Sequence, residues 1–181
     1  MKKVIAIVGM PGSGKSEAGV FFKEKGIPVL RFGSITDEGL QAKGLSLTQE
    51  NEKPFREQLR KELGMAAFAV KMEPKIQASL EENEIVILDG LYSWEEYLYL
   101  ADKFPFFLLL CIYAQPTIRY DRLQLRQVRP LSKQEARIRD IAEIEKLNKG
   151  GPIAIADFLI INEDTKEDLY QRLEKFLESV T

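Results

Sequence analysis

The stretch GMPGSGKS, residues 9–16, matches the spacing G-x-x-x-x-G-K-[ST] of a phosphate-binding loop, or P-loop. Glycines let the backbone turn sharply and direct its N–H groups toward phosphate oxygens. Pro11 has no N–H group, so its neighbours must supply the donors. We therefore expect phosphate groups to be bound by Gly9, Gly12, Ser13, Gly14, Lys15 and Ser16.

Two side chains at the end of this loop suit a nucleoside triphosphate and its metal ion. Lys15 carries a positive charge to the place where β- and γ-phosphates lie in such loops, so we expect it to act in catalysis. The Ser16 hydroxyl is the expected Mg²⁺ ligand. We also expect the Lys15 side chain to be exposed when the loop holds no phosphate.

The residues on either side of the loop provide the setting that a P-loop requires. Lys3–Val8 is a short, β-branched apolar run typical of a buried parallel strand. Ser16–Lys25 has a helical pattern, and Gly26 stands at its expected end. An ordinary glycine-rich turn is the alternative, but such a turn needs no strand before it and no helix after it.

The composition is that of a single globular domain covering residues 1–181. A net charge of −2 gives no bulk attraction to duplex nucleic acid or to an anionic membrane. One cysteine and no histidine exclude an internal disulfide and a four-cysteine zinc site. The apolar run before the loop is too short for a signal segment, so we expect a cytoplasmic protein.

Apolar runs typical of strands alternate with helical stretches along the chain. This alternation predicts an α/β fold of three layers, with a parallel sheet of about five strands and helices on both faces. The predicted strands are Val4–Val8, Pro28–Phe32, Glu84–Leu88, Phe106–Tyr113 and Asp157–Ile161.

Residues 33–83 form a long helical interval after the second predicted strand. Thr48 is a plausible helix cap, Gly64 ends the following helix, and Pro74 is expected to kink or bound the next one. Ligands of parallel sheets bind beyond the carboxyl ends of the strands, so this interval is a candidate wall of a site for a phosphate acceptor. Plain packing helices are an equally good interpretation.

Asp89 follows the third predicted strand directly, in the sequence EIVILDG at residues 84–90. An acid at this place lies beside a P-loop and can hold the Mg²⁺ shell or orient an acceptor, which makes Asp89 a candidate metal and catalytic residue. An aspartate–glycine pair after a strand is otherwise commonly a turn. The P-loop favours the metal interpretation.

An arginine series follows the fourth predicted strand. If one helix continued through the series, spacings of three, four and three would place its members on one face, although Pro130 limits such a helix. Arginine binds phosphate through two hydrogen bonds and suits a phosphoryl group in transfer. The alternative is a solvated face paired with acids such as Asp121 and Asp140. The series is Arg119, Arg122, Arg126 and Arg129, and a second amphipathic stretch opens at Ser132.

Taken together, these motifs resemble the P-loop nucleotide kinases, namely the adenylate-kinase-like and dephospho-CoA-kinase-like proteins. The chain is most similar to a little-characterised, largely archaeal group of predicted nucleotide kinases. The resemblance runs nearly end to end. Its markers are residues 8–16, 26–29, 44–48, 64–67, 87–90, 119–123 and 156–163.

The resemblance implies an ATP- or GTP-dependent phosphotransferase that uses Mg²⁺ and a small, nucleotide-like acceptor. It implies a lid over residues 126–139, with Arg126 and Arg129 catalytic, and nucleotide contacts from Arg122 and Asn162. A nucleotide-binding regulatory module or a slow NTPase switch is the alternative. Acceptor identity, the choice of ATP or GTP and the oligomeric state stay open.

Two positions depart from the pattern of nucleoside-monophosphate kinases. Asp37 and Tyr92 stand where these enzymes carry arginines that grip the acceptor phosphate. An unpaired carboxylate there would repel a phosphate, which predicts that AMP and similar monophosphates are poor acceptors. Three arginines, Arg31, Arg56 and Arg60, could offset it, but the sequence does not place them.

Overall fold

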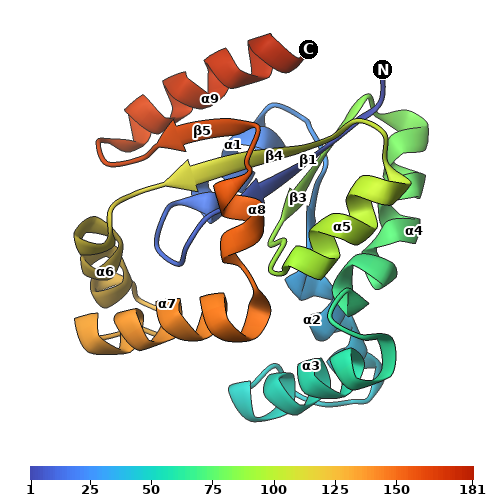
Figure 1. Ribbon diagram of the computed structural model, residues 1–181, viewed down its shortest axis with the longest axis vertical. Helices are drawn as coiled ribbons and strands as arrows, with labels where there is room; N and C mark the ends of the chain where they lie inside the picture. The colour runs from blue at the N-terminus through green and yellow to red at the C-terminus, as the bar shows by residue number, and fades with distance from the viewer.

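The computed structural model describes residues 1–181 and has a five-stranded sheet at its centre (Figure 1). All neighbouring strands run parallel, in the order β2-β3-β1-β4-β5, which confirms the predicted α/β fold. The strands are β1 (Lys3–Val8), β2 (Val29–Arg31), β3 (Ile85–Asp89), β4 (Phe107–Tyr113) and β5 (Phe158–Ile161).

Helices cover both faces of the sheet, and four more extend beyond its carboxyl edge (Figure 1). One face is covered by α1 (Lys15–Glu24) and α9 (Lys166–Val180). The other face is covered by α4 (Ala67–Glu82), α5 (Trp94–Lys103) and α8 (Gly150–Ala154). The remaining helices are α2 (Gly33–Ala42), α3 (Gln49–Leu63), α6 (Pro116–Leu125) and α7 (Lys133–Leu147). No helix combines the length and the apolar composition that a membrane span requires.

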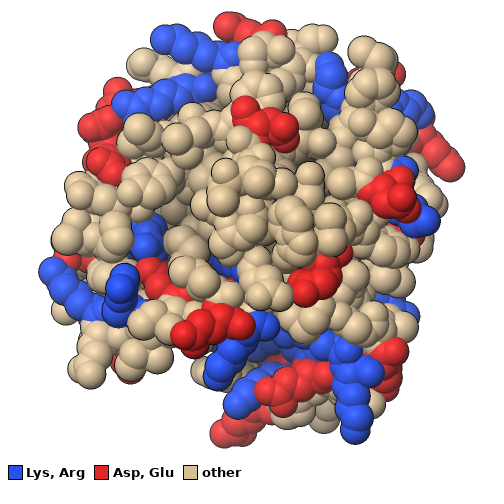
Figure 2. Space-filling model, in the orientation of Figure 1, with Lys and Arg blue, Asp and Glu red and all other residues tan.

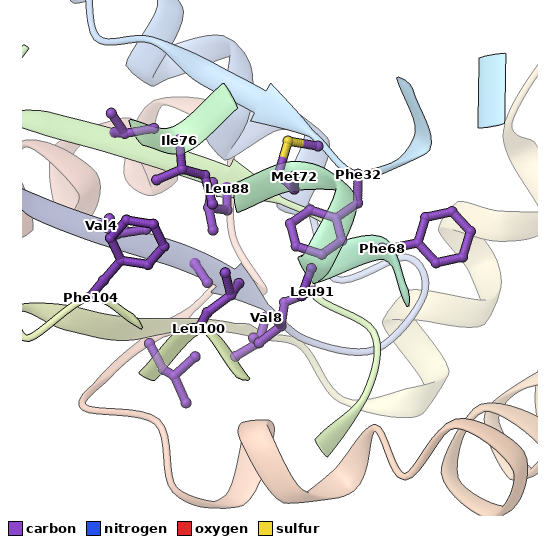
Figure 3. Close-up of a cluster of buried hydrophobic side chains, with 14 of the residues drawn as sticks. Val4, Val8, Phe32, Phe68, Met72, Ile76, Leu88, Leu91, Leu100 and Phe104 are labelled. Carbon is purple, nitrogen blue, oxygen red and sulfur yellow. The ribbon is translucent and has the colours of Figure 1, made fainter. Parts of the chain in front are cut away.

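The core consists of two apolar clusters, one on each face of the sheet. Val4, Ala6 and Val8 of β1 point into the first cluster, whereas Ile5 and Ile7 point into the second. Successive strand residues face opposite sides, so a strand covered on both sides must be apolar throughout. Figure 3 shows the first cluster, with Phe68 at its margin.

The strand register brings the sequence motifs to one edge of the sheet. In β3, Asp89 pairs in register with Ile7 of β1 on one side and with Arg31 of β2 on the other. The P-loop leaves β1 directly after this point. Asp89, Arg31 and the P-loop therefore lie at neighbouring strand ends.

Helix boundaries within 33–83 follow the local signals with one exception. Thr48 occupies the N-cap position of α3, although its side chain makes no capping hydrogen bond, and Gly64 ends that helix with a φ of 77°. Pro74 does not bound a helix as predicted, because α4 continues through it. Pro74 is exposed, so the carbonyl that loses its N–H partner lies on the solvent side of the helix.

The predicted single arginine face does not form. Helix α6 ends at Leu125, and Arg126 is its C-cap in an extended conformation. Arg129 has a left-handed φ of 54° and precedes Pro130, which disfavours a helical residue before it. Arg119 and Arg122 therefore lie on α6, whereas Arg126 and Arg129 belong to the loop before α7.

Arg119 is buried and joins three parts of the chain. Its guanidinium forms two hydrogen bonds with Asp140 of α7, at 3.0 and 2.6 Å. It also donates to the carbonyls of Pro11 in the P-loop, at 2.9 Å, and Ala114, at 3.0 Å. The alternative interpretation, in which arginines of the series pair with acids such as Asp140, is confirmed for Arg119. This pair is buried, however, and does not lie on a solvated face.

We predict that Arg119→Ala lowers the free energy of unfolding by about 3–5 kcal/mol, because it leaves Asp140 as a buried charge without its partner. Urea denaturation measures this change. Arg137→Ala removes the same charge from an exposed position of α7 and should shift stability by less than about 0.5 kcal/mol. Equal stability of the two variants would contradict the structural role of Arg119.

Candidate functional site

The P-loop turns closely past β4 and α6. Gly9 has a φ of 141°, and a Cβ atom at this residue would lie 2.3 Å from the carbonyl oxygen of Ile112. A Cβ atom at Gly12, whose φ is 81°, would lie 2.6 Å from the carbonyl oxygen of Arg119. Only glycine fits at these two points. The absence of side chains at these two residues therefore lets the loop backbone pack directly against β4 and α6, and it leaves no Cβ atom in the way of a phosphate.

Lys15 is folded back onto the loop and is not exposed as predicted. Its ammonium donates to the carbonyls of Gly9, at 2.9 Å, and Met10, at 3.1 Å. Burial and, to a smaller extent, the nearby charge of Lys149 together lower the pKa of Lys15 to about 7. The ammonium is thus desolvated before any ligand arrives, and bound phosphates would stabilise its charged form.

Asp89 lies close to the first turns of α1. A Cβ atom at Gly19 would be only 4.0 Å from Asp89 Oδ2. Burial raises the pKa of Asp89, although the charge of Lys15 opposes this shift. Its carboxylate makes no hydrogen bond or ion pair with another protein group, which leaves both oxygens available to a ligand.

The residues around the P-loop fit a Mg²⁺–nucleotide. The Ser13 hydroxyl is buried and has no hydrogen-bond partner, and the Ser16 side chain lies at the exposed start of α1. No group of three metal-binding side chains could hold an ion alone. Mg²⁺ typically keeps several waters and binds through few protein ligands together with substrate phosphates. Ser16 and Asp89 would be those ligands.

Asn162 and Arg122 lie against the P-loop. The Asn162 amide donates to the Ser13 carbonyl at 2.8 Å, and Arg122 donates to the Asn162 carbonyl at 2.9 Å. Both residues also line a cavity of about 300 Å³ beside Gly14 and Lys166. The amide of Asn162 therefore positions the loop. Its predicted contact with a nucleotide stays a prediction.

A larger cavity, of about 660 Å³, separates α2 and α3 from the α6–α7 segment. We call it the arginine cleft. In Figure 2, Lys and Arg side chains gather in the lower part of the molecule, where Figure 1 places α3 and α7. Besides Asp37, Glu52 and Glu143, the cleft is lined by Arg31, Arg56, Arg60, Arg126, Arg129 and Arg139.

The three carboxylates of the cleft pair with its arginines. Glu52 is buried and binds both Arg56, at 3.0 Å, and Arg129, at 3.1 Å. It thereby connects α3 to the loop before α7. Arg139 binds Glu143 at 2.9 Å within α7.

Asp37 forms an ion pair with Arg31 at the end of β2. Its charge is therefore offset, and the repulsion expected from the sequence does not arise from an unpaired acid. One premise behind the prediction of poor monophosphate acceptors, an unpaired Asp37, is therefore wrong, whereas the acceptor preference itself stays a prediction.

Lys149 was missed by the sequence analysis. Although it is a lysine in a short connection, it is only 3% exposed, and its ammonium binds Glu143 and lies 5.2 Å from the centre of the Tyr92 ring. Burial lowers its pKa and raises that of Tyr92 to about 12. A positive charge thus lies at Tyr92 after all, although it comes from a distant segment. No local pattern indicates this.

Solved structures with the same fold include several kinases. The crystal structure of TT1252 from Thermus thermophilus has a TM-score of 0.66 and 21% identity, covering 99% of this chain and 98% of that one. A shikimate kinase from Bacteroides thetaiotaomicron has a TM-score of 0.58 and 20% identity, covering 97% of this chain and 98% of that one. A gluconokinase from Sinorhizobium meliloti 1021 has a TM-score of 0.54 and 14% identity, covering 98% of this chain and 95% of that one. These likenesses show the fold.

Sequence comparison identifies nearer relatives. A family model described as an AAA domain matches residues 5–148. A UPF0200 protein of Thermococcus onnurineus (strain NA1) is 33% identical, covering 98% of this chain and 97% of that protein. A UPF0200 protein of Methanocaldococcus jannaschii is 34% identical, covering 98% of this chain and 90% of that protein. The chain therefore belongs to the archaeal UPF0200 proteins and to the AAA domain family, and it has the fold of P-loop kinases.

Proposed function

We propose that the protein is a phosphotransferase that moves the γ-phosphoryl group of ATP or GTP to a small, nucleotide-like acceptor. The observation that carries this proposal is the arginine cleft. Its lining residues Glu143 and Arg139 are also among the charges that act on Lys15. A donor held by the P-loop and an acceptor held in the cleft would therefore meet at Lys15.

Transfer of a phosphoryl group requires mainly positioning and charge neutralisation. Lys15 and the N–H groups of the P-loop would hold the donor phosphates. Bound Mg²⁺, held through Ser16 and Asp89, would supply further positive charge. Instead of holding Mg²⁺, or as well as holding it, the Asp89 carboxylate would orient the accepting group. Because such a transfer needs little proton chemistry, the absence of histidine is no obstacle.

We assign the acceptor side to the helices within 33–83 and the lid to residues 126–139. In the structure, Arg126 donates to the Arg129 carbonyl and Arg129 binds Glu52. Closure over a ligand would exchange these internal partners for phosphate oxygens. Both arginines would then stabilise transition-state charge and exclude water.

A nucleotide-dependent binding module or a slow NTPase switch is the alternative. The lack of an arginine at Asp37 and Tyr92 favours this alternative, whereas the cations Arg31, paired with Asp37, and Lys149, near the Tyr92 ring, favour the kinase. A coupled ADP-release assay over nucleotides, nucleosides and dephospho-CoA separates the two functions. Acceptor-dependent release with a phosphorylated product supports the kinase, whereas release that no acceptor changes supports the NTPase.

We predict that Lys15→Ala abolishes turnover and weakens MgATP binding, because the ammonium that neutralises the donor phosphates is lost. Titration calorimetry and the coupled assay measure the two effects. Lys23→Ala removes an exposed charge from the same helix and should leave both unchanged. Normal affinity and turnover in the Lys15 variant would overturn the donor site.

We predict that MgATP binding takes up nearly a full proton at about pH 8, one unit above the pKa of Lys15 in the free protein. Phosphates favour the charged ammonium and raise this pKa, so the mostly neutral amine must gain a proton. At about pH 6 the lysine is already charged and the uptake should vanish. Calorimetry in buffers of different ionisation enthalpy measures the proton count.

The matched control for this experiment is Lys15→Arg, because arginine stays protonated throughout. Its binding should show no proton uptake from this residue at either pH. Identical uptake by the wild type and the arginine variant would assign the proton to another group.

We predict that Arg129→Ala lowers kcat on the order of 10³-fold and changes donor Kd far less, since lid arginines act on transition-state charge. Steady-state kinetics with a separate donor titration tests this. Lys146→Ala removes an exposed charge from α7 and serves as the control. A wild-type kcat in the Arg129 variant would leave this arginine with the structural contact to Glu52 alone.

A further inference from the structure

The arginine cleft carries more positive charge than its own acids neutralise. Six arginines line it, against three carboxylates. Each of the three carboxylates forms ion pairs with particular arginines and not with the others. The excess is therefore located at identifiable side chains.

Arg60 is the cleft arginine without an internal partner. Arg31, Arg56, Arg129 and Arg139 each form an ion pair, and Arg126 donates to a backbone carbonyl. Arg60 forms no ion pair, and its Nε is buried with no hydrogen-bond acceptor. A buried, unpaired donor of this kind costs free energy unless a ligand supplies the acceptor.

The carboxylate whose charge acts most strongly on Arg60 is that of Glu96, which does not pair with it, although Glu96 Oε1 is also buried without a hydrogen-bond partner. Glu96 is fully buried, and its Oε2 accepts hydrogen bonds from the backbone N–H groups of Tyr92, at 2.7 Å, and Ser93, at 3.2 Å. It lies beyond ion-pair distance of Arg60. Burial raises the pKa of Glu96 to about 7, so near neutral pH this acid is only partly charged.

Packing fixes Arg60 at the cleft surface. Its guanidinium carbon lies 5.1 Å from the centre of the Phe68 ring, at the margin of the apolar cluster in Figure 3. A guanidinium that stacks on a ring keeps its N–H groups in its own plane, free for hydrogen bonds. Arg56 lies four residues earlier, so both side chains leave the same face of α3.

We propose that the acceptor of this kinase carries a phosphate monoester group of its own, which binds at Arg60 and Arg56 on α3. This inference rests on the proposed function for the role of the bound molecule. An anion bound by the Arg60 guanidinium would neutralise part of the excess charge of the cleft. A doubly charged phosphate fits an excess of three positive charges better than a single carboxylate does.

This subsite reverses the expectation drawn from Asp37 and Tyr92. The arginines that those positions lack are replaced by arginines of α3, one turn apart, on the opposite wall from α7. Phosphate-bearing acceptors such as AMP are therefore favoured over unphosphorylated ones. The adenosine part is not fixed by this argument, because the phosphate alone makes the contact.

Calorimetric titration of the protein saturated with MgADP tests the subsite, because the nucleotide keeps phosphates out of the P-loop. The probes are AMP and ribose 5-phosphate, compared with adenosine, ribose and gluconate. We expect binding of the two phosphate esters only. Arg60→Ala should weaken it on the order of 10- to 100-fold and leave MgADP binding unchanged, as expected for the loss of hydrogen bonds to a charged group.

Lys61→Ala is the matched control, since it removes an exposed positive charge from the next residue of α3. Arg60→Lys should give a partial loss, because the charge is kept and the paired hydrogen bonds are not. If Arg60→Ala does not fold, as judged by thermal unfolding, Arg60→Lys and Arg56→Ala provide the measurement.

The proposal is overturned if adenosine or gluconate binds as well as the phosphate esters do, if no phosphate ester binds, or if Arg60 variants bind AMP as the wild type does. Failure of MgADP to bind instead contradicts the donor site and the proposed function. In that case the same probes are titrated into Lys15→Ala, which still reports on Arg60.

Discussion

The position of β1 between β3 and β4 is the constraint on which the site depends. Its pairing with β3 places Asp89 level with Ile7, and its pairing with β4 brings Gly9 against the Ile112 carbonyl. Apolar residues on both faces fix this register, because a slip by one residue would exchange the two clusters. Core packing thus sets where the P-loop and its neighbouring acid begin, and Asn162 and Arg119 then hold the loop by hydrogen bonds to its carbonyls.

Features encoded locally could be predicted from the sequence. The P-loop, the five strands, the Thr48 cap and the Gly64 stop each depend on a few consecutive residues. The arginine face failed because periodicity does not reveal where a helix ends, and Arg126 leaves α6 in an extended conformation. The effect of Asp37 was misjudged because its partner, Arg31, is placed by the end of β2. The sequence offered Arg31 among three possible partners, but only the fold shows which of the three pairs with Asp37.

The arginines of the cleft are held in place and partly neutralised by its carboxylates. Glu52 holds Arg56 and Arg129 together, and Glu143 holds Arg139 and Lys149. An isolated cluster of guanidinium groups would repel itself and disorder, whereas bound carboxylates fix the side chains before a ligand arrives. The same carboxylates compete with a ligand for these arginines. The cleft therefore favours ligands whose charge exceeds that of a single carboxylate.

Arg119 decides which part of the α6–α7 segment can move. Its buried contacts attach α6 and Asp140 of α7 to the Pro11 carbonyl in the P-loop. Breaking them would expose a costly unpaired charge, so the middle of α7 stays with the P-loop during any closure. Between Leu125 and Ser132, Arg129 reaches the opposite wall through its ion pair with Glu52. Within the proposed lid, movement therefore falls on the loop before α7, where a ligand must replace the Arg129 partner of buried Glu52, which would keep its ion pair with Arg56.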